Sequence, residues 1–268
     1  MFILSVAPGT MAVSASTILP TAGPAVYSVS AAPSQYVSTN WSGYAVNSTK
    51  NSVTGVAGSW VVPAVTCNPS ANDDQYVVMW AGIDGFTSTT VEQIGTLAHC
   101  VKGSSTPTYS AWYEFYPAQP SIVTIKKVAI SPGDKVSATV SYSSSTKKFT
   151  VMITDLTSSK SFSKSKGDSK AMRSSAECIA EDPAGSTVTK GLFLLANFGT
   201  ADFGTAYTGV SSCTATVSGV TNNFGSFGTS TDELTMCTAI PSCSTVMAQP
   251  SSLAGGLSFT DKWDNAGP

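Results

Sequence analysis

The sequence predicts an all-β fold, an antiparallel sandwich or barrel, on three observations. Short apolar segments follow one another along most of the chain, separated by Gly, Pro, Ser and Asn. None of them sustains a helical period of 3.6 residues over more than about three turns. Helical segments do not alternate with the strands, which argues against a parallel sheet. The hydrophobic share of 42% is large enough to build a core.

The expected strands begin after residue 50 and are rich in β-branched and aromatic residues bounded by turn formers. In chain order they cover residues 56–62, 75–83, 91–98, 109–116, 122–130, 135–142, 149–155, 174–180 and 192–198. A lysine-rich stretch over residues 160–173 is expected to form a solvated hairpin tip, with a mobile flap as the alternative. We expect a single β-sandwich domain over residues 39–268.

The first 38 residues differ in composition from the rest of the chain. Residues 2–15 form a short apolar stretch that ends in the small-x-small pattern Val13-Ser14-Ala15, and the first charged residue is Lys50. This pattern is typical of a secretory signal that lacks its basic region, and a disordered tail is the alternative. Residues 16–38 are rich in Ala, Ser, Pro and Val, which indicates a pro-segment or linker. We therefore expect export, and no further apolar run of about 18 residues predicts a membrane helix.

Charge and cysteine content exclude several functional classes. Charged residues make up 11% of the chain, with 14 basic and 16 acidic side chains, so the basic footprint of a nucleic-acid binder is missing. The single histidine, His99, excludes a multi-histidine zinc site and is expected in a loop without a role. The six cysteines lack a C-x-x-C pattern and predict disulfides, with 15 possible connectivities. A local Cys237–Cys243 bond and a hairpin-bracketing Cys67–Cys100 bond are two candidates.

Strand alternation decides which polar side chains can act together, because successive side chains point to opposite faces. In the strand over residues 109–116, Trp112 and Glu114 share one face and Tyr113 takes the other. One face is expected in the core, and the other is expected to form an aromatic-lined groove or a second packed layer. Glu92 and Gln93 likewise point to opposite faces.

Two glutamates in the expected strand over residues 174–180 and directly after it share a face without being close. Glu177 and Glu181 are four residues apart in an expected strand, which separates them by about 13 Å. That distance is too long for two carboxyls to share one proton, so the pair alone does not predict an aspartic-protease type of dyad.

Six short motifs occur in a specific order and spacing. They are NWSGY at 40–44, WAGIDG at 80–85, QIG at 93–95, AWYEFYP at 111–117, AECIAED at 176–182 and NFG at 197–199. Together they resemble the glutamic peptidases, the eqolisin family of acid-acting endopeptidases, over about residues 40–203. The resemblance implies two curved antiparallel sheets with a substrate groove on one face, polypeptide substrates, and no metal or organic cofactor.

The resemblance also implies the site residues. Gln93 and Glu177 correspond to the family's catalytic pair. Residues expected to bind substrate or to lie beside the pair are Trp80, Asp84, Trp112, Tyr113, Glu114 and Glu181. Cys178 departs from the family pattern, which usually has Trp there, and alternation turns it away from Glu177.

The residue types suit peptide cleavage in acid. Imidazole is already protonated well below its pKa of about 6.5, whereas a carboxylate with a pKa near 4 still accepts a proton. Glu177 is expected to take a proton from the attacking water and to return it to the leaving amine. The Gln93 amide does not titrate, so it can donate to the developing oxyanion at any pH.

Two other functional classes stay open at this point. A glycoside hydrolase would use two of Glu92, Glu114 and Glu177, with carboxyls about 5–10 Å apart across a sugar-binding groove. A non-enzymatic β-sandwich module would use the aromatic face for binding alone. For the peptidase we expect a secreted monomer that does not contact nucleic acid or, once processed, a membrane, and whose N-terminal segment is a zymogen pro-region.

Overall fold

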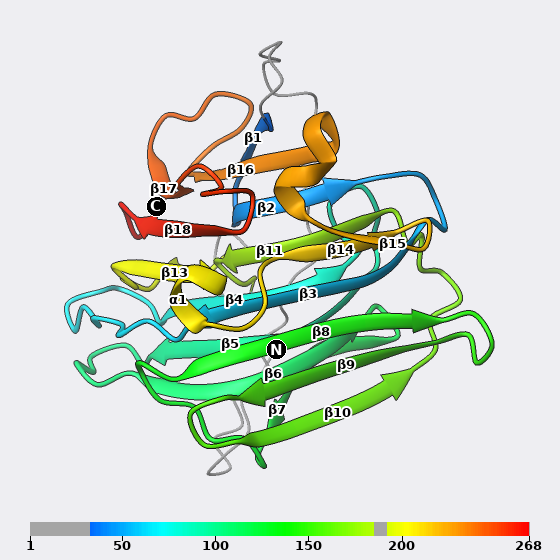
Figure 1. The fold of residues 1–268 in the computed structure, drawn as a ribbon. Coiled ribbons are helices and arrows are strands. Elements are labelled where there is room, and N and C mark those ends of the chain that lie inside the picture. Colours follow the sequence, from blue (N-terminus) through cyan, green and yellow to red (C-terminus); the bar gives the residue numbers. More distant parts are fainter. Residues whose placement is uncertain (1–32, 185–191, 268) are drawn as a thin grey trace.

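The computed structural model describes residues 33–184 and 192–267, and these are mostly β-strand (Figure 1). The expected signal and most of the expected pro-segment therefore lie outside the described residues. Within them, no helix is both long and apolar enough to cross a membrane. The helical elements are one short turn, α1 (Thr205–Thr208), and a 3-10 segment, η1 (Phe224–Ser230).

Eight strands form the first sheet, in the spatial order β1, β16, β2, β11, β4, β5, β6, β7. All neighbours are antiparallel except β1 and β16. Their bounds are β1 (Ser34–Ser38), β2 (Trp41–Asn47), β4 (Gln75–Ile83), β5 (Val91–Cys100), β6 (Thr108–Tyr116), β7 (Gln119–Ile125), β11 (Ser175–Glu181) and β16 (Thr231–Cys237). A two-residue strand, β12 (Leu194–Leu195), adds a parallel pairing to β4.

The second sheet runs β10, β9, β8, β3, β13, β18, β17, with all neighbours antiparallel. The hairpin of β14 and β15 also pairs with β3, and β17 pairs with β16 to join the two sheets. Their bounds are β3 (Val53–Val61), β8 (Lys135–Ser143), β9 (Lys148–Asp155), β10 (Lys160–Lys166), β13 (Thr200–Gly204), β14 (Thr214–Val217), β15 (Val220–Asn223), β17 (Val246–Pro250) and β18 (Ser258–Trp263). The predicted antiparallel sandwich is confirmed.

The main core lies between β4–β5 of the first sheet and β3, β8 and β9 of the second (Figure 1). Strands β8 and β9 alternate buried and exposed residues, as expected for strands with one face in water. Strands β4, β5 and β11 are buried along their whole length, although β5 and β11 carry polar and acidic residues among the apolar ones. The Trp60 indole N–H donates to Thr96 Oγ1 at 2.9 Å across the core.

The structure corrects several predicted boundaries. Residues 34–38 form β1 and pair with β16, so the end of the segment assigned to the pro-region or linker belongs to the first sheet. The expected strand over 192–198 is reduced to the two residues of β12, and the one over 122–130 ends at residue 125. Residues 160–166 of the lysine-rich stretch form β10, an exposed strand paired with β9 along its whole length, and residues 167–173 lead from β10 to β11 without forming a strand. The stretch is therefore not a hairpin tip.

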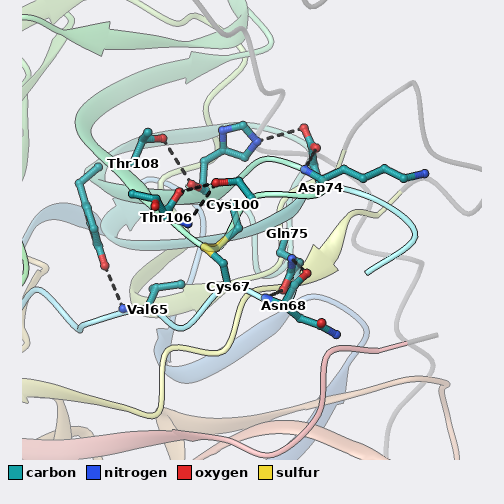
Figure 2. The surroundings of a disulfide bond; sticks show 12 residues. Val65, Cys67, Asn68, Asp74, Gln75, Cys100, Thr106 and Thr108 are labelled. Carbon is teal, nitrogen blue, oxygen red and sulfur yellow. Dashed lines mark hydrogen bonds and ion pairs between the residues drawn. A yellow bond between two sulfur atoms is a disulfide. The ribbon is translucent and has the colours of Figure 1, made fainter. Parts of the chain in front are cut away.

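Three disulfides link the described residues: Cys67–Cys100, Cys178–Cys213 and Cys237–Cys243. Two of them were the candidates from the sequence. Cys67–Cys100 joins the segment before β4 to the end of β5 (Figure 2). Cys178 lies on the core face of β11, away from Glu177, as alternation predicted.

His99 is not a loop residue. It lies in β5, is 1% exposed, and its Nε2 is 3.0 Å from Asp74 Oδ2. Its ring stacks on Tyr76 at 4.1 Å between centroids. Burial lowers the pKa of His99, and the neighbouring Asp74 carboxylate works in the opposite direction. The residue is a packed structural element at the far end of β5 from Gln93.

Candidate active site

The predicted catalytic pair lies in one row that crosses the first sheet at right angles to its strands. Glu114 on β6 is directly opposite Gln93 on β5, Gln93 is opposite Gly82 on β4, and Gly82 is opposite Glu177 on β11. Directly opposed residues point to the same face of an antiparallel sheet. The three polar side chains therefore project from one face, and this face is turned away from the second sheet.

Gly82 lies between the two residues of the predicted catalytic pair. The α-carbons of Gln93 and Glu177 are two strand spacings apart, about 10 Å. A Cβ at Gly82 would stand 2.7 Å from Trp80 Cζ3 and 3.2 Å from Gln93 Cβ. The edge of the Trp80 indole thus occupies the place of a side chain at Gly82. This edge of the indole lies between the strands that carry Gln93 and Glu177, and we call it the Trp80 floor.

The Gln93 amide is held by Glu114. Gln93 Nε2 donates to Glu114 Oε2 at 2.9 Å, and both side chains are buried. Burial raises the pKa of Glu114 well above its usual range, while the bond from Gln93 lowers it and the Glu181 carboxylate raises it. The sequence alone did not indicate this pairing, because it depends on the register of β5 against β6.

Glu177 is 0% exposed, and its surroundings favour the protonated form. Burial is the largest cause and raises its pKa well above the usual range, and the Asp84 and Glu92 carboxylates raise it further. The Ser175 hydroxyl and the Phe86 backbone N–H lower the pKa of Glu177. Neither group makes a well-formed hydrogen bond to the Glu177 carboxylate. A raised pKa makes the ionised carboxylate a stronger base and reduces the fraction that is ionised in acid.

Asp84 ties the β4–β5 loop to the segment that enters β11. Its carboxylate accepts hydrogen bonds from the backbone N–H groups of Arg173 at 2.6 Å and Ser174 at 2.8 Å. It also accepts from the hydroxyls of Ser174 and Thr90. Asp84 adopts a left-handed backbone conformation with φ of 70°, which Asp tolerates better than most residues. The structure thus places Asp84 as a support for the strand that carries Glu177.

Glu181 anchors the tryptophan floor. Its carboxylate accepts from Trp80 Nε1 at 2.7 Å and from Asn40 Nδ2 at 3.3 Å. Burial raises the pKa of Glu181 to about 8, and the side-chain N–H groups of Trp80, Trp41 and Asn40 lower it. Trp41 packs edge-on against Trp80, with ring centroids 4.9 Å apart. The NWSGY motif at 40–44 and the second acid of AECIAED therefore act together on Trp80.

The structure separates the two aromatic residues predicted from β6. Trp112 lies on the face of the catalytic row, in a line with Gly95 and Trp80. Tyr113 lies on the opposite face and stacks on Phe162 with centroids 5.4 Å apart. Tyr113 is therefore not brought together with the other predicted site residues.

Sequence reasoning missed two members of the row. Gly82 belongs to the site because a side chain at this position would collide with Trp80. Its place inside the WAGIDG motif could have drawn attention to it. Asp232 on β16 extends the row beyond Ala45, is 2% exposed, and has a pKa raised by burial to about 7. Nothing in the sequence around Asp232 singles it out.

The structure also contains a cavity that lies away from this row. A cavity of about 450 Å³ is bordered by the segment before β4, β12 and Trp263, and no predicted site residue lines it. In the part of the chain that the structure describes, no group of three or more His, Cys, Asp or Glu side chains is arranged to hold a metal ion.

Comparison with known proteins places the chain in a family. A model of the peptidase A4 family matches residues 39–248. The chain belongs to the peptidase A4 family. The prediction of a glutamic endopeptidase is thereby confirmed at the level of the family. No curated protein sequence matches the chain.

Solved glutamic peptidases share the fold of this peptidase A4 member. Scytalido-glutamic peptidase with a transition state analog inhibitor is 22% identical, covers 84% of this chain and 98% of its own, and has a TM-score of 0.65. SCP-B of the eqolisin family, in a complex with the tripeptide Ala-Ile-His, is 21% identical with coverages of 84% and 98% and a TM-score of 0.61. Aspergilloglutamic peptidase from Aspergillus niger is 24% identical with coverages of 71% and 99% and a TM-score of 0.55.

The geometry weighs against the glycoside hydrolase alternative. Glu92 lies on the core face of β5, opposite to Gln93, so it cannot share a groove with Glu114 or Glu177. The α-carbons of Glu114 and Glu177 are three strand spacings apart, about 14 Å, with Gln93 between them. No pair of these carboxyls is arranged to flank a glycosidic bond.

Proposed function

We propose that the chain is a secreted acid endopeptidase in which Glu177 activates the attacking water and Gln93 stabilises the oxyanion. The observation that carries this proposal is the placement of Gln93 and Glu177 on one face, on either side of Gly82. A scissile carbonyl above the Trp80 floor would have an amide donor on one side and a carboxylate on the other.

The reaction needs only these two side chains and water. Ionised Glu177 accepts a proton from water while the water oxygen bonds to the carbonyl carbon, and the carbonyl π electrons move to the oxygen. A Gln93 N–H donates to that oxyanion, a role whose loss typically costs about 3 kcal/mol in the barrier. Glu177 then returns the proton to the nitrogen as the C–N bond breaks, and the products are an acid and an amine.

Accessibility supports a zymogen. Gln93 is 1% exposed and Glu177 is 0% exposed, so a polypeptide cannot reach them as they stand. Tyr36 of β1 packs edge-on against Phe86, whose backbone N–H lies near Glu177. We expect the N-terminal segment to be removed in acid. The cleavage is expected upstream of Ser34, because β1 begins there and belongs to the first sheet. Three disulfides are in keeping with an extracellular protein.

The test is cleavage of a denatured protein substrate from pH 2 to 7, with N-terminal sequencing to follow processing. Wild type is expected to be active only in acid, and Glu177→Gln and Gln93→Ala are each expected to abolish activity while remaining folded. Cleavage that survives Glu177→Gln would refute the catalytic assignment. A folded and processed wild type without peptidase activity at any pH would refute the proposed function.

A further inference from the structure

The contact between Gln93 and Glu114 is only half formed. One hydrogen bond joins Gln93 Nε2 to Glu114 Oε2, but the remaining oxygen of each group, Gln93 Oε1 and Glu114 Oε1, is buried without a partner among the described residues. A buried acceptor without a donor costs free energy. The two oxygens therefore lack a proton that one of them could donate to the other.

One proton on Glu114 satisfies both oxygens. A protonated carboxyl offers an O–H donor and a C=O acceptor, and a primary amide offers an N–H donor and a C=O acceptor. We propose that protonated Glu114 is a positioning residue that clamps the Gln93 amide by two reciprocal hydrogen bonds. Glu114 O–H donates to Gln93 Oε1, and Gln93 Nε2–H donates to the Glu114 carbonyl oxygen. This inference rests on the proposed function, since it concerns how the oxyanion donor is oriented.

The orientation of the amide in the structure, with Gln93 Nε2 bonded to Glu114 Oε2, decides which end of it meets the substrate. With Oε1 engaged by Glu114, the second Nε2–H is left to point into the space above Gly82. An amide turned by 180° would instead present Oε1, and an acceptor repels a developing oxyanion. Ionised Glu114 would lose the bond to Oε1 and would add a negative charge next to the oxyanion.

The surroundings of Glu114 favour its protonated form. Glu181 on β11 is the charged group that acts on it, and its carboxylate opposes ionisation of Glu114. Strand β7, which pairs with β6, carries no titratable side chain. On β5 the neighbouring acid, Glu92, faces the core, and Glu177 lies three strands away in the same row. Burial acts in the same direction and raises the pKa of Glu114.

The two glutamates then have opposite requirements. Glu177 must lose its proton to act as a base, and Glu114 must keep its proton to hold Gln93. Activity is therefore expected to follow a bell-shaped pH profile, with the acidic limb dominated by Glu177 and the alkaline limb by Glu114. The two apparent values belong to the coupled system of carboxyls rather than to isolated residues.

Three variants test the clamp through kcat and its pH profile. Glu114→Met removes both hydrogen bonds and is expected to lower kcat about 10²-fold. Glu114→Gln reproduces the one donor and one acceptor of a protonated carboxyl, so its kcat in acid is expected to be close to that of wild type. The alkaline limb of its pH profile is expected to move to higher pH. Glu92→Gln is the matched control, the same chemical change one residue from Gln93 but on the other face, and is expected to leave that limb in place. All profiles are taken where tryptophan fluorescence shows a folded protein.

The proposal is overturned if Glu114→Gln is as inactive as Glu114→Met, or if its alkaline limb coincides with that of wild type. A second measurement does not depend on activity. The side-chain 1H–15N signals of Gln93, identified by their loss in Gln93→Ala, should titrate in wild type and not in Glu114→Gln. Titrating signals in a protein without peptidase activity would uphold the clamp and refute the proposed function, whereas signals that do not titrate would refute the clamp whatever the activity.

Discussion

Asp261 gives the clearest quantitative test of how this protein depends on acid. It lies on β18, is 0% exposed, and its Oδ1 accepts a hydrogen bond from Ser42 Oγ at 2.8 Å. Its Oδ2 has no partner among the described residues. Burial is the main cause that raises the pKa of Asp261 to about 8, and the Asp264 and Glu233 carboxylates add to it. The Ser42 hydroxyl and the Lys262 backbone N–H lower it.

The sign of the effect follows from linkage between folding and proton binding. The pKa of Asp261 is higher in the folded chain than in the unfolded chain, where it is about 3.9, so the folded state binds the proton more tightly. This contribution to stability is complete below pH 4 and is lost as the pH rises from about 4 to 8. By pH 7 the loss is about 4 kcal/mol, at about 1.4 kcal/mol per pH unit.

Other buried acids act in the same direction. Burial raises the pKa of Glu181 to about 8 and that of Asp232 to about 7. It also raises the pKa of Glu92, Glu114, Glu177 and Asp182. Since the free energy of unfolding of a domain is typically 5–15 kcal/mol, we expect a protein that is most stable below pH 4 and only marginally stable at pH 7.

The variant Asp261→Asn isolates one of these groups. An amide cannot ionise, and its carbonyl still accepts from Ser42, so the variant is expected to match its parent near pH 3.5. By pH 7 it should be more stable than the parent by up to about 4 kcal/mol. The assay is urea denaturation followed by tryptophan fluorescence at several pH values, with both proteins in a Glu177→Gln background to prevent autolysis.

The control is Asp134→Asn, the same change at a half-buried turn residue that accepts from the Ser131 backbone N–H. It is expected to leave the slope of stability against pH close to that of the parent. Parallel slopes for Asp261→Asn and its parent would refute the reasoning, because Asp261 would then not hold its proton in the folded state.

Three further predictions concern the site and its support. Gly82→Ala places a methyl group 2.7 Å from Trp80 Cζ3, so it should lower kcat and destabilise by about 1–3 kcal/mol; unchanged kinetics would mean that the Trp80 floor yields freely. Asp84→Asn turns an amide toward two backbone N–H donors, so it should destabilise by about 3 kcal/mol and lower kcat, and a neutral result in both assays would contradict the supporting role. Replacing Cys67 and Cys100 by Ala opens a disulfide spanning 33 residues and should cost about 4 kcal/mol in urea denaturation at acid pH, with kcat of the folded enzyme retained.

The sequence by itself determined the local features of this protein. Its β-branched runs and turn formers predicted most strands, and alternation placed Glu92 and Tyr113 on the faces opposite to Gln93 and Trp112. These features depend on the two-residue period of a strand, which is written into neighbouring residues. The ordered motifs likewise identified the family before any contact between them was known.

Only the tertiary structure decided how these pieces meet. The row from Glu114 to Glu177 depends on the register of β6, β5, β4 and β11, strands drawn from residues 75 to 181. Register is set by long-range packing, and a slip of one residue would turn every side chain to the other face. The burial of His99 and Asp232, and hence the direction of their pKa shifts, depends in the same way on strands that are distant in the chain. The motifs therefore led to the predicted catalytic residues, and long-range pairing brought Gln93 and Glu177 onto one face.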